Sequence, residues 1–105
     1  FKISWVFVRK PVVFSPLFDV TLYRDSGFSG RLRQYSHWEC VNIEPDEQVV
    51  SSIDTHGTCV QIFERYNCKG DMRELYPGSS SHNNLAALNF NDKTKSLGAC
   101  PRDRQ

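Results

Sequence analysis

Short runs of hydrophobic and alternating residues recur along this chain. Residues Val20 to Tyr23 are β-branched, aliphatic or aromatic, which is typical of a β-strand. A polar turn follows and ends at Gly30, after which the chain resumes with Leu32-Arg-Gln-Tyr35, which mixes apolar and polar residues. Two such runs joined by a turn that contains glycine predict a β-hairpin.

The same hairpin pattern recurs 40 residues later. The first copy has Val20, Leu22, Tyr23, Gly30 and Arg33 where the second has Val60, Ile62, Phe63, Gly70 and Arg73. Ser52-Ile53 then matches Ser96-Leu97 at an offset of 44, so a few loop residues were gained in between. A glycine kept at one hairpin position marks a backbone with positive φ or a place with no room for a side chain.

Further short segments complete each copy. We expect third strands at 40–43 and 85–88, and last strands at 49–53 and 95–97. No window of ten or more residues shows sustained helical periodicity. Four short strands per copy predict an all-β sandwich of two tandem Greek-key motifs. The first motif covers about 18–56 and the second about 57–101, within one domain at 18–105.

Residues 1–17 lie outside the repeat. Alternate positions Phe1, Ile3, Trp5 and Phe7 are apolar, which indicates an extra strand. The strand or arm would cover an edge or a face of a sheet. Alternatively, it binds a partner or a second copy of the chain by adding to a sheet edge.

The cysteines indicate the compartment. A chain of 105 residues has room for one core, and its four cysteines, Cys40, Cys59, Cys68 and Cys100, are spaced 19, 9 and 32 residues apart. None of these spacings is typical of a zinc site or a CxxC redox motif. We therefore predict two disulfides and a secreted protein. The alternative is four buried thiols in a cytosolic protein.

Charge and motifs exclude several functions. The 13 basic and 12 acidic residues are mixed along the chain, so a nucleic-acid partner is not expected. No apolar run approaches the roughly 20 residues of a membrane span. His37, His56 and His82 lack zinc-site spacing, and no nucleophile elbow, phosphate loop or HExxH motif occurs. We predict a protein that is not an enzyme and requires no cofactor.

The hairpins resemble the Greek-key signature of the βγ-crystallins, an aromatic residue, four residues, a second aromatic, one residue and glycine. The first copy has Tyr23, Phe28 and Gly30 at these positions, and the second copy has Phe63 and Gly70 with Cys68 replacing the second aromatic. A later serine, which in that family ties the last loop to the folded hairpin, matches Ser52 and Ser96. The resemblance covers about residues 18–100.

The resemblance also implies a disulfide pairing. In the family, the third strand of each motif crosses into the sheet of the other motif, which would place Cys40 beside the strand that begins at Cys59. Cys68 lies in the second hairpin and Cys100 closes the last strand. The resemblance therefore implies Cys40–Cys59 and Cys68–Cys100, one of three possible connectivities. Cys68 would replace an aromatic packing contact with a covalent one.

Calcium-binding βγ-crystallins resemble one another in a loop of two Asn/Asp residues, two variable residues, Ser/Thr and Ser. The aligned loops here are 91–96 and 47–52, and the candidate ligands are Glu47, Gln48, Ser51, Asn91, Asp92 and Ser96. In the second loop Lys95 occupies the hydroxyl position, and an ammonium group repels a cation. In the first loop the leading pair is Glu-Gln. Because each family site draws on both loops, we expect weak or lost calcium binding; a working site is the alternative.

The remaining candidate site is the polar loop 77–84. Ser79, Ser80, Ser81 and His82 form either a solvated connection or a presented binding loop. The resemblance implies a non-enzymatic module that acts on a protein or cell-surface target, as a defence, antimicrobial, toxin-like or effector protein. Two alternatives stay open, a proteinase inhibitor that presents a rigid loop and a structural calcium-binding extracellular protein.

Overall fold

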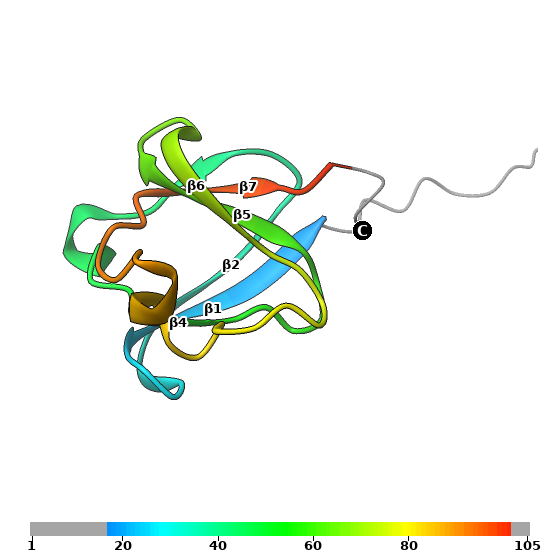
Figure 1. Ribbon diagram of the computed structural model, residues 1–105. Helices are drawn as coiled ribbons and strands as arrows, with labels where there is room; N and C mark the ends of the chain where they lie inside the picture. The colour runs from blue at the N-terminus through cyan, green and yellow to red at the C-terminus, as the bar shows by residue number, and fades with distance from the viewer. Residues whose placement is uncertain (1–16, 102–105) are drawn as a thin grey trace, which may run out of the picture.

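The computed structural model describes residues 17–101 (Figure 1), so most of the expected N-terminal arm lies outside the described residues. The hairpins are long because their residues favour strands and their turns contain positive-φ positions. The strands are β1 (Phe18–Asp25), β2 (Ser29–His37), β3 (Val41–Asn42), β4 (Ser52–Asp54), β5 (Val60–Arg65), β6 (Lys69–Leu75) and β7 (Ser96–Ala99). Two short 3-10 helices, η1 (Pro45–Glu47) and η2 (Leu85–Leu88), lie in the connections.

Two antiparallel sheets form the sandwich (Figure 1). The first has the order β2-β1-β4 and the second β3-β7-β5-β6. Strand β3 thus belongs to the first motif but pairs in the sheet of the second, which confirms the crossover for the first motif. One apolar core lies inside, made of Phe18, Val20, Leu22, Tyr35, Ile43, Val50, Ile53, Val60, Ile62, Leu75, Leu85, Phe90 and Leu97.

The two hairpins fold alike, as the repeat predicts. Gly30 has φ 74° and Gly70 has φ 82°, a region that side chains disfavour. A Cβ would lie 3.0 Å from Asp25 Oδ2 at Gly30 and 2.9 Å from Arg65 Cγ at Gly70. Both explanations proposed for the repeated glycine, positive φ and lack of space, are therefore confirmed.

The expected third strand of the second motif is wrong. Residues Leu85–Leu88 form η2 and not a strand, so the first sheet has three strands. Leu85 is fully buried and Leu88 packs partly against the core. Residues three apart share one face of a helical turn but opposite faces of a strand, so this spacing favours the helix. Asn89, at φ 57°, ends it.

The predicted disulfide pairing is also wrong, although both disulfides are present. The structure has Cys40–Cys68 and Cys59–Cys100, with Cα–Cα distances of 6.1 and 5.7 Å. The cause is the strand order, because β7 lies between β3 and β5. Val60 pairs with Ala99 across β5 and β7, so the next residues outward, Cys59 and Cys100, are cross-strand neighbours.

Cys68 does replace an aromatic contact with a covalent one, but its partner is Cys40. In the first hairpin the Phe28 ring packs edge-on against Tyr23, with ring centroids 5.8 Å apart. In the second hairpin the sulfur of Cys68 packs over Gly98, where an added Cβ would lie 3.1 Å from it. The disulfide to Cys40 then fastens the second hairpin to the start of β3.

Candidate functional site

The first two residues of the first calcium-type loop, Glu47 and Gln48, form hydrogen bonds with other side chains of the protein. Glu47 is 8% exposed, and its carboxylate accepts hydrogen bonds from the Tyr35 hydroxyl at 2.8 Å and from Arg33 Nε at 2.7 Å. Burial, together with the bond to Glu47, raises the pKa of Tyr35 to about 12. The neighbouring carboxylate also raises the pKa of Arg33. Gln48 donates its amide to the hydroxyl of Tyr66 at 2.8 Å.

The serines that close the loops tie the hairpins down, as the resemblance implies. Ser52 Oγ accepts from the Phe28 amide at 3.1 Å and donates to the Asp25 carbonyl at 2.6 Å. Ser96 Oγ does the same in the second hairpin, with the Cys68 amide at 2.9 Å and the Arg65 carbonyl at 2.6 Å. Both serines are fully buried. Ser96 therefore already uses its hydroxyl within the fold.

The remaining loop residues are spread over the surface of two connections. Ser51 is half-buried, and its amide bonds to the Tyr23 carbonyl at 2.9 Å. Asn91 and Asp92 are exposed, and the Asp92 amide bonds to the Val50 carbonyl at 3.0 Å. The two loops thus contact each other through the backbone.

A hollow of about 400 Å³ lies at the second loop, between the end of β5 and the start of β7. Its lining residues are Glu64, Arg65, Asp92, Lys93 and Lys95. Three cations against two carboxylates give a net positive charge, which opposes binding of a divalent cation. Within residues 17–101, three His, Cys, Asp or Glu ligand atoms come within 4.8 Å of one another at Cys59, Glu74 and Cys100, and both of these sulfurs are in a disulfide.

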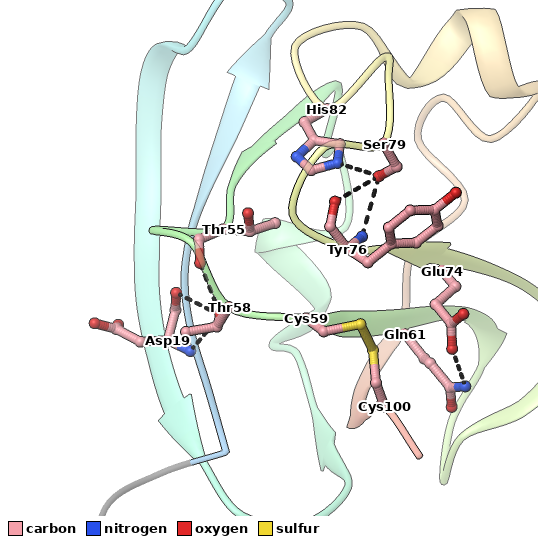
Figure 2. Close-up of a disulfide and its surroundings, with 10 residues drawn as sticks. All are labelled: Asp19, Thr55, Thr58, Cys59, Gln61, Glu74, Tyr76, Ser79, His82 and Cys100. Carbon is pink, nitrogen blue, oxygen red and sulfur yellow. Dashed lines mark hydrogen bonds between the residues drawn. A yellow bond between two sulfur atoms is a disulfide. The ribbon is translucent and has the colours of Figure 1, made fainter. Parts of the chain in front are cut away.

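The loop 77–84 is a folded structure fastened at both ends (Figure 2). Ser79 Oγ donates to the Tyr76 carbonyl at 2.8 Å and contacts His82 Nε2 at 2.5 Å. The His82 carbonyl accepts from the Ile53 amide at 2.9 Å, which joins the loop to β4. Burial lowers the pKa of His82. Ser81, half-buried with φ 71°, and the exposed Ser80 complete the predicted set.

A second hollow, of about 440 Å³, adjoins this loop. Ser79 and Ser80 line it together with Tyr76 and Arg73 from the β6 side and Leu88 from η2. Tyr76 is 46% exposed. Arg73 and Tyr76 were not among the site residues predicted from sequence. A usable signal for Tyr76 is an aromatic residue directly before the Pro-Gly turn at the end of an edge strand.

Arg73 is held rigidly at the rim of this second hollow. Its Nε donates to the Leu88 carbonyl at 2.9 Å, and its guanidinium lies over the Phe90 ring at 5.0 Å. Phe90 is fully buried, so the arginine stem is fixed against the core. The hollow therefore combines a fixed cation, the carboxylate of Glu74, an exposed aromatic ring, hydroxyls and an aliphatic wall. Such a combination suits polar-aromatic recognition of a ligand.

No protein-family model and no curated protein matches the chain. Solved structures do match. A structure from work on the evolution of the eye lens βγ-crystallin domain fold is 26% identical, with a TM-score of 0.64 over 84% of this chain and 91% of that one. A βγ-crystallin from an archaeon is 17% identical, with a TM-score of 0.60 over 79% and 98%. IPSE/alpha-1 from Schistosoma mansoni eggs is 15% identical, with a TM-score of 0.59 over 85% and 93%. The chain has a βγ-crystallin-like fold.

Proposed function

We propose that this βγ-crystallin-like domain is a secreted, non-enzymatic binding module that engages a protein or cell-surface target, as a defence, toxin-like or effector protein does. Two disulfides support an oxidising, extracellular setting. Within residues 17–101 no helix has the length and apolar character of a membrane span.

The observation that carries this proposal is the hollow beside the loop 77–84. It has the volume of a ligand pocket, and its rim places Tyr76 next to Arg73. Tyrosine and arginine are enriched among the residues that dominate binding energy in protein interfaces. The loop is already fastened by Ser79 and by the His82 carbonyl, so little conformational entropy would be lost on binding.

The same loop gives no support to the proteinase-inhibitor alternative. A segment that binds in a protease cleft as an added strand needs an extended backbone. Here the Ser79 amide bonds to the Tyr76 carbonyl at 2.9 Å, and the Asn84 amide to the Ser81 carbonyl at 3.1 Å. Both contacts close tight turns, which shorten the loop and turn it back on itself.

Replacing Tyr76 with alanine is expected to weaken target binding by about 30-fold, the loss associated with an interface hot spot. The measurement is the affinity of the intact disulfide-bonded protein for its positive spots on an array of extracellular proteins and cell-surface glycans. Trp38→Ala is the matched control. Trp38 is also 46% exposed, but it follows β2, an edge strand of the first sheet, whereas Tyr76 follows β6, an edge strand of the second. An equal loss in both variants, or no array binding by the unmodified protein, would contradict the proposal.

Weak or lost calcium binding is part of the proposed function. The carboxylate of Glu47 already accepts hydrogen bonds from Tyr35 and Arg33, and Lys95 brings positive charge to the second loop. We expect a calcium dissociation constant weaker than about 1 mM by calorimetry, beyond the extracellular range. Lys95→Ser should tighten binding, because it removes the ammonium and supplies a hydroxyl. A dissociation constant below about 10 μM for the unmodified protein would show a working site and favour the structural calcium-binding alternative.

A further inference from the structure

The two disulfides differ in their access to solvent. Cys59 and Cys100 are 2% and 4% exposed, whereas Cys40 is exposed and Cys68 is half-buried. Disulfide exchange begins when a thiolate reaches a disulfide sulfur, so its rate depends on access. Exposed disulfides are the labile ones in proteins, and buried ones resist reduction.

A carboxylate also lies close to the buried disulfide. A carboxylate oxygen of Glu74 lies within 4.8 Å of the sulfurs of Cys59 and Cys100 (Figure 2). The attacking thiolate is an anion, and a carboxylate at this distance repels it. The buried disulfide is therefore shielded both by the surrounding protein and by charge.

Within the exposed disulfide, the two sulfurs are not equivalent. Cys68 Sγ faces the sheet, 3.2 Å from the Leu97 carbonyl oxygen and against Gly98. Cys40 directly precedes β3 and is an exposed residue. An incoming thiolate thus meets Cys40 first. Once released and protonated, the Cys68 thiol has the Leu97 carbonyl in place as a hydrogen-bond acceptor.

We propose that Cys40–Cys68 is a thiol-exchange site, at which a thiol of a small molecule or of another protein becomes bonded to Cys40. The external thiolate forms a new S–S bond with Cys40 Sγ, the Cys40–Cys68 bond breaks, and its electron pair leaves on Cys68, which then takes up a proton. No net oxidation occurs, because one disulfide replaces another. The thiol itself is the co-reactant, and the product is a mixed disulfide at Cys40.

The fold keeps its second hairpin after this step. The Asn67 amide bonds to Asn42 Oδ1 at 2.7 Å, and Asn42 Nδ2 donates to Asn67 Oδ1 at 3.2 Å. Ser96 still holds the Cys68 amide, and Cys59–Cys100 still joins β5 to β7. The exchange is therefore local, and Cys40 becomes an attachment point on a folded domain. This inference does not depend on the hollow beside Tyr76.

The test uses the native disulfide-bonded protein in a buffer of reduced and oxidised glutathione at neutral pH, quenched at intervals with iodoacetamide and read by peptide mass mapping. We expect glutathione on Cys40 and alkylation of Cys68, at a rate at least about 10-fold above any modification of Cys59 or Cys100. Circular dichroism should stay unchanged meanwhile. The Glu74→Gln variant should accelerate modification of Cys59–Cys100 and leave the rate at Cys40 the same.

Three results would overturn the proposal. The first is equal rates at the two disulfides, the second is glutathione on Cys68 instead of Cys40, and the third is modification only when the domain unfolds. Modification that requires unfolding is recognised because its rate rises steeply with low concentrations of urea. Global unfolding exposes surface to urea, whereas local disulfide exchange does not.

Discussion

Replacing both Cys59 and Cys100 with alanine should lower the free energy of unfolding by about 4 kcal/mol, which is the chain-entropy value for a closed loop of this length. The two residues are 41 apart in sequence and nearly fully buried, and their bond joins the start of β5 to the end of β7. Without it, the unfolded chain gains freedom, and the last strand loses its covalent link to the second sheet. Urea denaturation followed by tryptophan fluorescence measures the change.

The control for this experiment is the double alanine variant at Cys40 and Cys68. Its loop is shorter, with a sequence separation of 28, and the entropy model gives a similar loss of about 3.5 kcal/mol. The two variants should nevertheless differ in the folded state. Removing the exposed disulfide should raise hydrogen exchange only around β3 and the second hairpin, whereas removing the buried one should raise it along β5 and β7. Identical exchange patterns would contradict this assignment.

The second large effect is expected at the paired serines. Ser52→Ala removes the hydroxyl that accepts from the Phe28 amide and donates to the Asp25 carbonyl, and it leaves both groups without that partner. Leaving a buried donor or acceptor unsatisfied costs about 1–3 kcal/mol. Ser96→Ala removes the same two bonds in the second hairpin. Each variant should therefore lose about 2–4 kcal/mol of stability.

The serine variants should differ in local order. The second hairpin stays fastened to β3 by the covalent bond Cys40–Cys68, whereas the first keeps only non-covalent contacts, the edge contact of Phe28 with Tyr23 and the bond from the Gly27 amide to the Asn83 carbonyl at 2.8 Å. Amide exchange at residues 26–30 should rise strongly in Ser52→Ala, and exchange at residues 66–70 should rise less in Ser96→Ala. Reduction of the exposed disulfide should narrow this difference in amide exchange, leaving the Asn42–Asn67 hydrogen bonds to hold the second hairpin. An unchanged stability in both variants would show that the two hydroxyls do not hold the hairpins.

The hairpins and the paired serines were predictable because each leaves a local mark in the repeat, whereas the crossover of β3 was implied only by the resemblance to the βγ-crystallins. Gly30 and Gly70 occupy positions where a side chain would clash, so the repeat reports backbone geometry directly. The disulfide partners were not predictable in this way. Cys40 and Cys59 seemed neighbours only while β3 was placed next to β5, and the order of strands depends on packing across the whole sheet.

Two other features also depend on tertiary contacts. Residues Leu85–Leu88 are too short a run for sequence periodicity to separate a strand from a helical turn, and only the contact of both leucines with the one core shows that they share a face, which selects the turn. Glu47 resembles a metal ligand in sequence because nothing local shows that Tyr35 and Arg33 hold its carboxylate. The hollow at Tyr76 draws on β6, η2 and a loop, so no single stretch of sequence encodes it.

The crossing of β3 has a consequence for the independence of the two motifs. Strand β3 belongs to the first motif but pairs with β7 of the second, so the first motif made as a separate chain would leave β3 without its partner strand. Cys40–Cys68 crosslinks the two motifs at this crossing strand, while Cys59–Cys100 stays within the second motif. The covalent bond between the motifs therefore lies where the pairing of strands already makes each depend on the other.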